Sequence, residues 1–370
     1  MIYLDNSATT RPSAIALDAF RHTAESVFGN PSSVHAPGTE AAKLLKAARE
    51  TVAAAMHAEP STIYFTSGGT LADNLAVLGA VNPKQGGSVV TTAIEHPAVK
   101  STCAFLEKQG VRVTYVKPGK DGVVSQEAIR EALTADTVLV SVMHVNNETG
   151  AIMPVEKIKA TMQAICPRAL FHTDCVQSFG KLPIMPRAWG ADFISVSAHK
   201  MHGLRGAGAL YIAQGVHLRP SIFGGGQEKD IVPGTENLPA IAAFAAACRA
   251  LGSQDKVYAL SARLRQALSA MPGVYINSPQ DALPHILNVS FGKLPSEVVT
   301  NALSNAGVCV SSGSACAAAR SEKSYVLRAM DAPNPDSGVR FSLSDTTTEA
   351  EIEEAIRIIQ TIIPMLMAAV

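Results

Sequence analysis

Short apolar runs alternate with amphipathic stretches over the first two-thirds of the chain. The runs are rich in β-branched residues, which predicts buried strands. They read, in order, TIYFT, SVVTTAI, VRVTYV, TVLVSVM, LFHTD, ADFISVS and ALYIA. Most of the intervening stretches carry apolar residues at helical spacing. This alternation predicts an α/β fold with a mostly parallel sheet and helices on both faces.

The pattern changes after two helical stretches, residues 238–251 and 256–271. Beyond them come shorter strands, which read GVYIN, HILNVSF, VCVSS and VRFSL. Thr348 and Glu351 form a capping box that opens a last amphipathic helix. We therefore predict two domains. A large domain covers residues 13–252, and a smaller α+β domain is built from residues 1–12 and 253–370.

Composition and charge exclude several functional classes. The 370 residues are 47% hydrophobic, and the 31 basic residues balance the 31 acidic ones, so nothing favours binding to nucleic acid or an anionic membrane. The most apolar segments are too short or too interrupted to span a bilayer. Six cysteines form no C-x-x-C pair and we expect no signal peptide, which favours reduced thiols in the cytoplasm. No Cys/His spacing fits a structural metal site, so we expect no metal.

A lysine with unusual neighbours follows one of the predicted strands. Ser197, His199 and Lys200 come at the end of ADFISVS, before a glycine-rich segment. A lysine at the mouth of a strand suits a Schiff-base amine held against a phosphorylated cofactor, because a partly dry pocket lowers its pKa. This motif alone leaves open a surface lysine in a glycine-rich loop.

Other predicted strands also end in polar groups. The FTSGGT turn could bind a phosphate through its backbone N–H groups and the hydroxyls of Ser67 and Thr70, although most Gly-Gly turns are only turns. His96 follows SVVTTAI and places an imidazole at the same edge. Asp174 ends LFHTD, where a carboxylate would keep a ring nitrogen protonated, or would cap a helix.

Taken together, the motifs resemble the pyridoxal-phosphate-dependent cysteine desulfurases of the NifS-like group I type, within the class V aminotransferases. The matches run in family order from Tyr3 to the final helix: LDNSATT, GNPSS-x-H, FTSGGT-x-ADN, EHPAV, HVNNETG, HTD-x-x-QS-x-GK, SAHKMHG, GGGQE, PGTEN, NVSF, SSGSAC, SYVLRAM and VRFSL. The resemblance implies the fold of fold-type I transferases, with a seven-stranded sheet in the large domain. It also implies pyridoxal 5'-phosphate as cofactor and conversion of L-cysteine to L-alanine. The sulfur would pass to an enzyme cysteine as a persulfide and then to acceptors such as iron–sulfur cluster or thio-cofactor assembly proteins.

The resemblance also implies roles for individual residues. Lys200 would bind the cofactor covalently, His96 would stack on its ring and assist proton transfer, and Cys316 in SSGSAC would be the nucleophile. Asp174 would pair with the ring nitrogen and Gln177 with the ring hydroxyl. The full cofactor-binding set would be Gly69, Thr70, His96, Asn147, Asp174, Gln177, Ser197, His199, Lys200 and Thr235. Asn147 and Arg340 would bind the substrate carboxylate. Thr235 would reach the phosphate of the neighbouring subunit, which implies a homodimer with shared active sites.

Other functions remain open at this point. A selenocysteine lyase or another class V aminotransferase would use the same Lys200, His96 and Asp174, although SSGSAC argues against a plain aminotransferase. A third alternative is a sulfur-relay or assembly subunit, which would keep the same fold but have little activity of its own. The chain departs from the family pattern at Leu71, Val232, residues 203–205 and residues 344–345. These departures leave the sulfur acceptor and the turnover rate undetermined.

Overall fold

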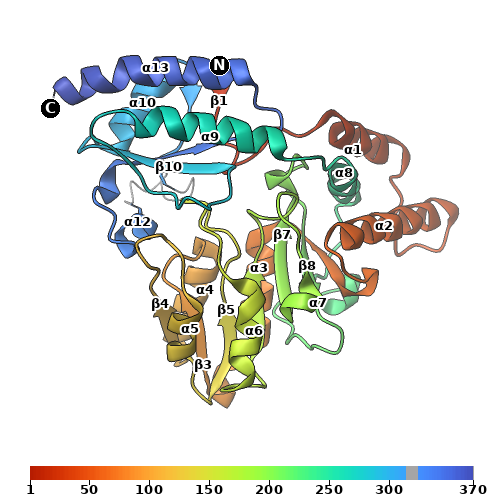
Figure 1. Ribbon diagram of the computed structural model, residues 1–370. Helices are drawn as coiled ribbons and strands as arrows, with labels where there is room; N and C mark the ends of the chain where they lie inside the picture. The colour runs from red at the N-terminus through yellow and green to blue at the C-terminus, as the bar shows by residue number, and fades with distance from the viewer. Residues whose placement is uncertain (314–323, 370) are drawn as a thin grey trace.

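A seven-stranded sheet forms the centre of the larger part of the structure, a computed structural model that describes residues 1–313 and 324–369 (Figure 1). Its strands lie in the order β2-β8-β7-β6-β5-β3-β4. Their bounds are β2 Ile63–Thr66, β3 Ser88–Thr92, β4 Arg112–Val116, β5 Thr137–Ser141, β6 Leu170–Asp174, β7 Phe193–Ser197 and β8 Gly208–Ile212. β8 runs antiparallel to β2 and β7, and the other neighbouring pairs are parallel. The predicted α/β class and mostly parallel sheet are therefore confirmed.

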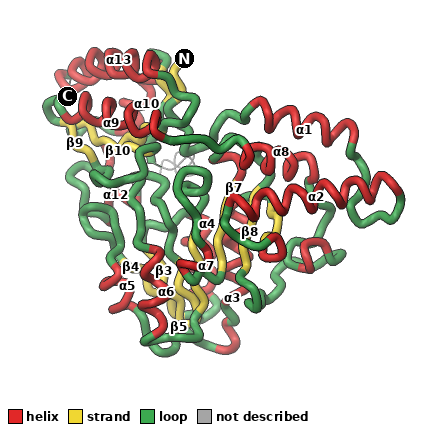
Figure 2. The backbone as a smooth tube through the Cα atoms, turned by 45° about the vertical axis from the view of Figure 1, so that its right-hand side comes forward, coloured by secondary structure: helices red, strands yellow, loops and turns green. Residues whose placement is uncertain are grey.

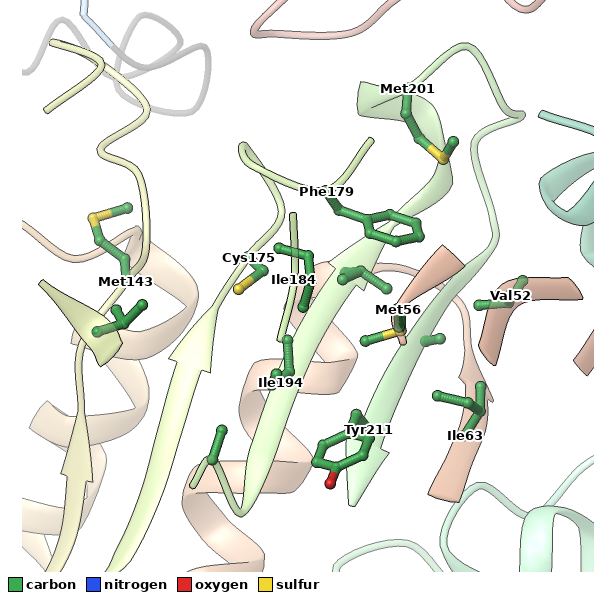
Figure 3. Packing of buried hydrophobic residues seen from close by; sticks show 14 of the residues in the cluster. Val52, Met56, Ile63, Met143, Cys175, Phe179, Ile184, Ile194, Met201 and Tyr211 are labelled. Carbon is green, nitrogen blue, oxygen red and sulfur yellow. The ribbon is translucent and has the colours of Figure 1, made fainter. Parts of the chain in front are cut away.

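Both faces of this sheet are buried under helices. Val89 of β3 packs with residues of α3 and α4, whereas the next residue, Val90, packs on the opposite face with residues of α5 and α6. Phe193 and Ile194 of β7 divide in the same way, as successive strand residues must. Figure 3 shows Ile194 and Tyr211 of this second face packed with Met56. The helices flanking the sheet are α3 Gly69–Ala80, α4 Pro97–Lys108, α5 Gln126–Ala132, α6 Val155–Gln163 and α7 Pro186–Trp189.

Three further helices form a layer at one side of the larger part (Figure 1). They are α1 Ala14–Ser26, α2 Ala36–Ala55 and α8 Leu238–Arg249, and α8 packs against both of the others. The first two begin at residues whose side chains cap them. Ser13 accepts a hydrogen bond from the Ala16 N–H, and His35 Nδ1 accepts one from the Gly38 N–H. Because His35 caps α2, the helix begins at Ala36.

A smaller three-stranded sheet, in the order β12-β10-β9, carries the C-terminal part of the chain. Its elements are α9 Asp255–Ser269, β9 Val274–Ile276, β10 Ile286–Phe291, α10 Ser296–Asn305, β12 Gly338–Ser342 and α13 Glu349–Ala368. β1 Ile2–Tyr3 joins this part by pairing with β11 Val308–Cys309. Both ends of the chain lie here (Figure 2). The capping box of Thr348 and Glu351 opens α13 as predicted.

Separate hydrophobic clusters support the proposed division into two domains. Ile2 and Leu4 pack with residues of α9, α10 and α13, as the assignment of residues 1–12 to the smaller domain requires. However, Val326 and Leu327 of α12 (Tyr325–Ala329) pack into the cluster under the large sheet. The boundary at residue 252 therefore remains a proposal, with α12 bridging the two parts.

Five of the six cysteines lie in the described part of the chain. Cys103, Cys166, Cys175 and Cys248 are buried and free, and Cys309 is free and partly buried. No helix among residues 1–313 and 324–369 is long and apolar enough to cross a bilayer. Over the same residues, no group of histidine, cysteine and acidic side chains is arranged to hold a metal ion.

Candidate active site

A cavity of about 390 Å³ lies beyond the carboxyl ends of the central strands. This is where open α/β sheets bind their ligands. Ten of the residues predicted from the sequence line it: Gly69, Thr70, His96, Asn147, Asp174, Gln177, Ser197, His199, Lys200 and Arg340. Thr235 is exposed and is not part of the lining. Cys316 lies outside the described residues.

The Lys200 amine is held by the N-terminal arm of the chain. Its Nζ donates hydrogen bonds to the carbonyl oxygens of Ser7 and Ala8, at 2.5 and 2.8 Å. The arm is itself fixed to the turn that carries the lysine, because the Thr10 N–H donates to the His199 carbonyl at 2.9 Å. No local pattern in the sequence indicates these contacts, since almost two hundred positions separate the partners.

The FTSGGT turn is closely packed and places the start of α3 at the cavity. A side chain at Gly69 would lie 2.6 Å from Val176 Cγ2, so the position has room only for glycine. Gly68 has φ 152°, which also favours glycine. The first N–H groups of α3 have no intrahelical partner and carry the positive end of the helix dipole. With the Thr70 and Ser197 hydroxyls, they can bind a phosphate.

Asp174 faces the cavity from the end of β6. Its Oδ1 accepts a hydrogen bond from the Val176 N–H at 2.8 Å. Burial, together with the nearby Asp73 carboxylate, raises the pKa of Asp174 to about 8. A cation placed against this carboxyl group would restore its ionised form, because opposite charge favours ionisation. Asp174 is therefore suited to pair with a protonated ring nitrogen.

His96 is neutral at pH 7. Burial, and after it the charge of Lys200, lowers its pKa to about 4. Its Nδ1 accepts a hydrogen bond from the Ala98 N–H at 3.2 Å, at the start of α4. The ring proton is thereby assigned to Nε2. A neutral imidazole of this kind can stack on an aromatic ring and exchange a proton.

Arg340 is the largest fully buried side chain of the described residues. Its two Nη atoms donate to the Asn147 carbonyl oxygen at 2.8 Å and to Asp5 Oδ1 at 2.9 Å. The Nε atom is buried with no hydrogen-bond partner in the described part of the chain. The guanidinium is thus fixed in place, while its Nε–H is left for a ligand.

Asp73 and His172 form a buried pair to which sequence reasoning gave no role. Asp73 lines the cavity, and its Oδ1 lies 3.5 Å from His172 Nε2. Burial raises the pKa of Asp73 to about 7. Asp73 belongs to the motif FTSGGT-x-ADN, and His172 belongs to HTD-x-x-QS-x-GK. The two motifs therefore already indicated that both residues lie near the site.

The residues of the cavity fit pyridoxal phosphate. Five buried polar atoms that belong to lining residues have no hydrogen-bond partner among the described residues: Asp73 Oδ1, Asn147 Oδ1, Gln177 Oε1, Ser197 Oγ and Arg340 Nε. Buried polar groups are nearly always paired, so such atoms in one cavity indicate a polar ligand. A phosphate at the start of α3 and a ring nitrogen at Asp174 would suit this set.

Comparisons with known proteins agree with this geometry. The model of the family described as "Aminotransferase class-V" matches residues 2–355. Cysteine desulfurase 2 of Trichormus variabilis is 40% identical over 377 residues, which cover 100% of this chain and 94% of the relative. A solved structure titled "NIFS-LIKE PROTEIN" matches with a TM-score of 0.92 and 34% identity, covering 98% of this chain and 99% of that one. Another, titled "SspA in complex with cysteine", matches with a TM-score of 0.84 and 33% identity, covering 93% and 99%.

Proposed function

The chain belongs to the class-V aminotransferase family, whose cysteine desulfurases are pyridoxal-phosphate enzymes, and from this premise we propose that it desulfurates L-cysteine to L-alanine. The observation that carries the proposal is the single cavity lined by Lys200, Asp174 and Arg340. These side chains supply an amine, a partner for a ring nitrogen and a partner for a carboxylate. Relatives named cysteine desulfurase support the same reaction, and the neighbour in complex with cysteine supports the same substrate.

The cofactor is assigned to this cavity residue by residue. Gly69, Thr70, Ser197 and His199 would hold the phosphate, and Lys200 would bind the cofactor covalently. Asp174 would pair with the ring nitrogen and Gln177 with the ring hydroxyl. When bound, pyridoxal phosphate would supply an electron sink for the negative charge that develops at the substrate α-carbon.

The remaining chemistry is done by side chains of the chain. Arg340 and Asn147 would hold the substrate carboxylate, with the planar guanidinium fixing its orientation. The Lys200 amine would take the α-proton as a general base. His96, neutral and with its proton on Nε2, would cover the ring and assist the return of a proton to carbon.

Sulfur transfer is assigned to Cys316, on the evidence of the SSGSAC motif alone. Its thiolate would attack the substrate sulfur, forming an S–S bond while the C–S bond breaks. The electron pair of the broken bond stays on the substrate carbon, which takes up the proton of the substrate thiol and becomes the methyl group of alanine. The enzyme is left with a persulfide, a reversible form of oxidised cysteine. An acceptor protein would then remove the sulfane sulfur.

We further propose a homodimer with shared active sites in the cytoplasm. Thr235 is exposed in the single chain and takes no part in the cavity, so a role in phosphate binding requires a second copy. Acceptors such as iron–sulfur cluster or thio-cofactor assembly proteins would receive the sulfur. The free cysteines of the described part agree with a reducing compartment.

Product analysis separates the candidate functions. Protein loaded with pyridoxal phosphate and given L-cysteine and a thiol reductant should produce alanine and sulfide in equal amounts. Keto-acid formation would instead indicate an aminotransferase, and a strong preference for L-selenocysteine would indicate a selenocysteine lyase. Bound cofactor without any product would indicate a sulfur-relay subunit.

Arg340→Ala should raise the apparent KM for cysteine by about ten- to a hundredfold, because a charge-assisted hydrogen bond is worth about 1.5–3 kcal/mol. Steady-state kinetics measure this effect. Arg340 also holds the Asn147 carbonyl and Asp5, so thermal unfolding of the variant should be measured in parallel.

Arg328→Ala is the matched control, since Arg328 forms a half-exposed ion pair with Asp336 at 2.6 Å. Its KM should equal that of the wild type. An unchanged KM in a folded Arg340→Ala enzyme would remove Arg340 from the substrate site.

A further inference from the structure

One ion pair joins the two proposed domains close to the candidate active site. His202 lies two positions after Lys200 in the larger domain, and its Nε2 lies 2.8 Å from Asp345 Oδ1 in the smaller one. Asp345 comes three positions after the end of β12, the strand that carries Arg340. Among the ion pairs between described residues, no other spans the two domains. The pair therefore links the segment of the proposed general base to the segment of the proposed carboxylate partner.

Both ring nitrogens of His202 face hydrogen-bond acceptors. Nδ1 lies 2.8 Å from the Arg11 carbonyl oxygen, and Nε2 faces the Asp345 carboxylate. A carbonyl oxygen and an ionised carboxylate can only accept, so each nitrogen must carry a hydrogen and the ring must be an imidazolium. The His202 side chain is only 16% exposed, so salt and water screen its charge incompletely. The neutral ring cannot make both contacts.

The backbone of His202 has an uncommon conformation. Its φ is 63°, a left-handed value that is rare for residues other than glycine, asparagine and aspartate. The His202 N–H donates to Thr10 Oγ1 at 2.8 Å, and its carbonyl oxygen accepts from the Ser13 N–H at 2.9 Å. Such a conformation persists where the surrounding contacts determine it. The N-terminal arm that holds the Lys200 amine thus also holds His202 toward Asp345.

The groups around the pair make Asp345 decisive for the charge of His202. Of the described residues, the other titratable groups that face the pair are basic: Lys181, Lys200, Lys256 and His285. Burial opposes the charge of His202, but the hydrogen bond to Asp345 and the charge of Asp345 outweigh burial and raise the pKa of His202 above its usual value of 6.5. The same hydrogen bond lowers the pKa of Asp345.

Resting on the proposed function, we propose that His202 and Asp345 are positioning residues that form a charged clamp between the domains and fix Arg340 relative to Lys200. In the proposed reaction Arg340 holds the substrate carboxylate while Lys200 takes the α-proton. These two groups belong to different domains, so their separation depends on contacts between the domains. Small errors in such a separation are costly, because the reacting atoms must be held in one geometry.

The clamp should hold only while both of its groups are charged. Because the pKa of His202 is raised, the clamp is complete below the usual value of 6.5 and is lost as the pH rises through the raised pKa. Asp345 has a lowered pKa and therefore stays ionised throughout this range. Hydrogen bonds between uncharged groups, such as that from the Thr10 N–H to the His199 carbonyl oxygen, also join the domains but do not titrate. The clamp is thus a pH-dependent part of the interface.

The first test compares kcat/KM for cysteine between the wild type and Asp345→Asn, both loaded with pyridoxal phosphate, from about pH 6 to about pH 9. At the acid end the wild type should be faster by about fivefold, the upper range for a partly exposed ion pair. The ratio should fall to one above the His202 midpoint, where the wild-type clamp is already open. Groups that titrate alike in both enzymes cancel in the ratio. A loss of folded protein alone would give a ratio that does not depend on pH.

Two further measurements use His202→Asn, since asparagine tolerates the left-handed backbone of this position. In the NMR spectrum of the cofactor-free wild type, the ring signal that is absent from this variant should titrate with a midpoint above 6.5. Asp345→Asn should lower that midpoint. The double variant should be no slower than either single variant at the acid end, because each substitution breaks the same clamp.

Glu353→Gln is the matched control for the change of charge. Glu353 is 45% exposed, against 46% for Asp345, and it pairs with Arg263 at 2.6 Å within the smaller domain. Its kcat/KM should equal that of the wild type at every pH, because this ion pair does not join the domains.

The outcomes separate the clamp from the proposed function. A wild-type enzyme that makes no alanine from cysteine would overturn the proposed function. An active enzyme would overturn the clamp if the ratio for Asp345→Asn is the same at every pH, or if Glu353→Gln changes the rate in the same way. Additive losses in the double variant would also overturn it, because the two residues would then act separately. If Asp345→Asn does not fold, the ratio for His202→Asn decides, since it breaks the same ion pair.

Discussion

Lys200→Ala should abolish the covalent attachment of pyridoxal phosphate and reduce desulfuration by about 10⁴-fold or more, because one amine serves as both the attachment point and the general base. The fold should be unchanged. The amine donates to the Ser7 and Ala8 carbonyl oxygens, and removing a charge from a partly buried position does not open a large cavity.

Borohydride reduction followed by peptide mass spectrometry measures the attachment. Wild-type protein should be yellow and should carry reduced cofactor on the peptide that contains residue 200. Lys181→Ala is the informative companion, because Lys181 and Lys200 line the same small cavity and Lys181 is therefore a rival for attachment. The Lys181→Ala protein should still carry the reduced cofactor on the peptide that contains residue 200. A label that persists in Lys200→Ala would show that another lysine holds the cofactor.

The sheet and the main part of the cavity could be predicted because they depend on local patterns. Each strand was visible as an apolar run, and the alternation of Val89 and Val90 between two faces follows from strand geometry alone. Polar residues at the ends of parallel strands must meet at one edge. That is why His96, Asp174 and Lys200, far apart in sequence, line the same cavity.

The hydrogen bonds of Lys200 and the ion pair of Asp345 could not be predicted, because they join segments that are distant in the sequence. The carbonyl oxygens of Ser7 and Ala8 reach Lys200 only because the N-terminal arm crosses to the large sheet. Asp345, read from the sequence as a departure from the family pattern, forms an ion pair with His202. Neither pairing has a local pattern that would indicate it.

Cys316→Ser should separate the two halves of the reaction. The variant should still bind cofactor and should still show the absorbance change that cysteine causes, because Lys200, Asp174 and Arg340 are untouched. It should form no protein persulfide, and sulfide release should fall by at least about a hundredfold, since a serine hydroxyl is not ionised at neutral pH and the thiolate is the reactive form. Mass spectrometry after exposure to cysteine measures the persulfide.

The other cysteines provide the control for this experiment. Burial raises the pKa of the thiols of Cys103, Cys175 and Cys248, so these groups are poor nucleophiles. Cys309 is the partly buried one of the five described cysteines and is therefore the strongest rival. Cys309→Ser should keep persulfide formation at the wild-type level. A persulfide mapped to Cys309 or Cys175 in the wild type would refute the assignment of Cys316, and the SSGSAC segment would then have a structural role.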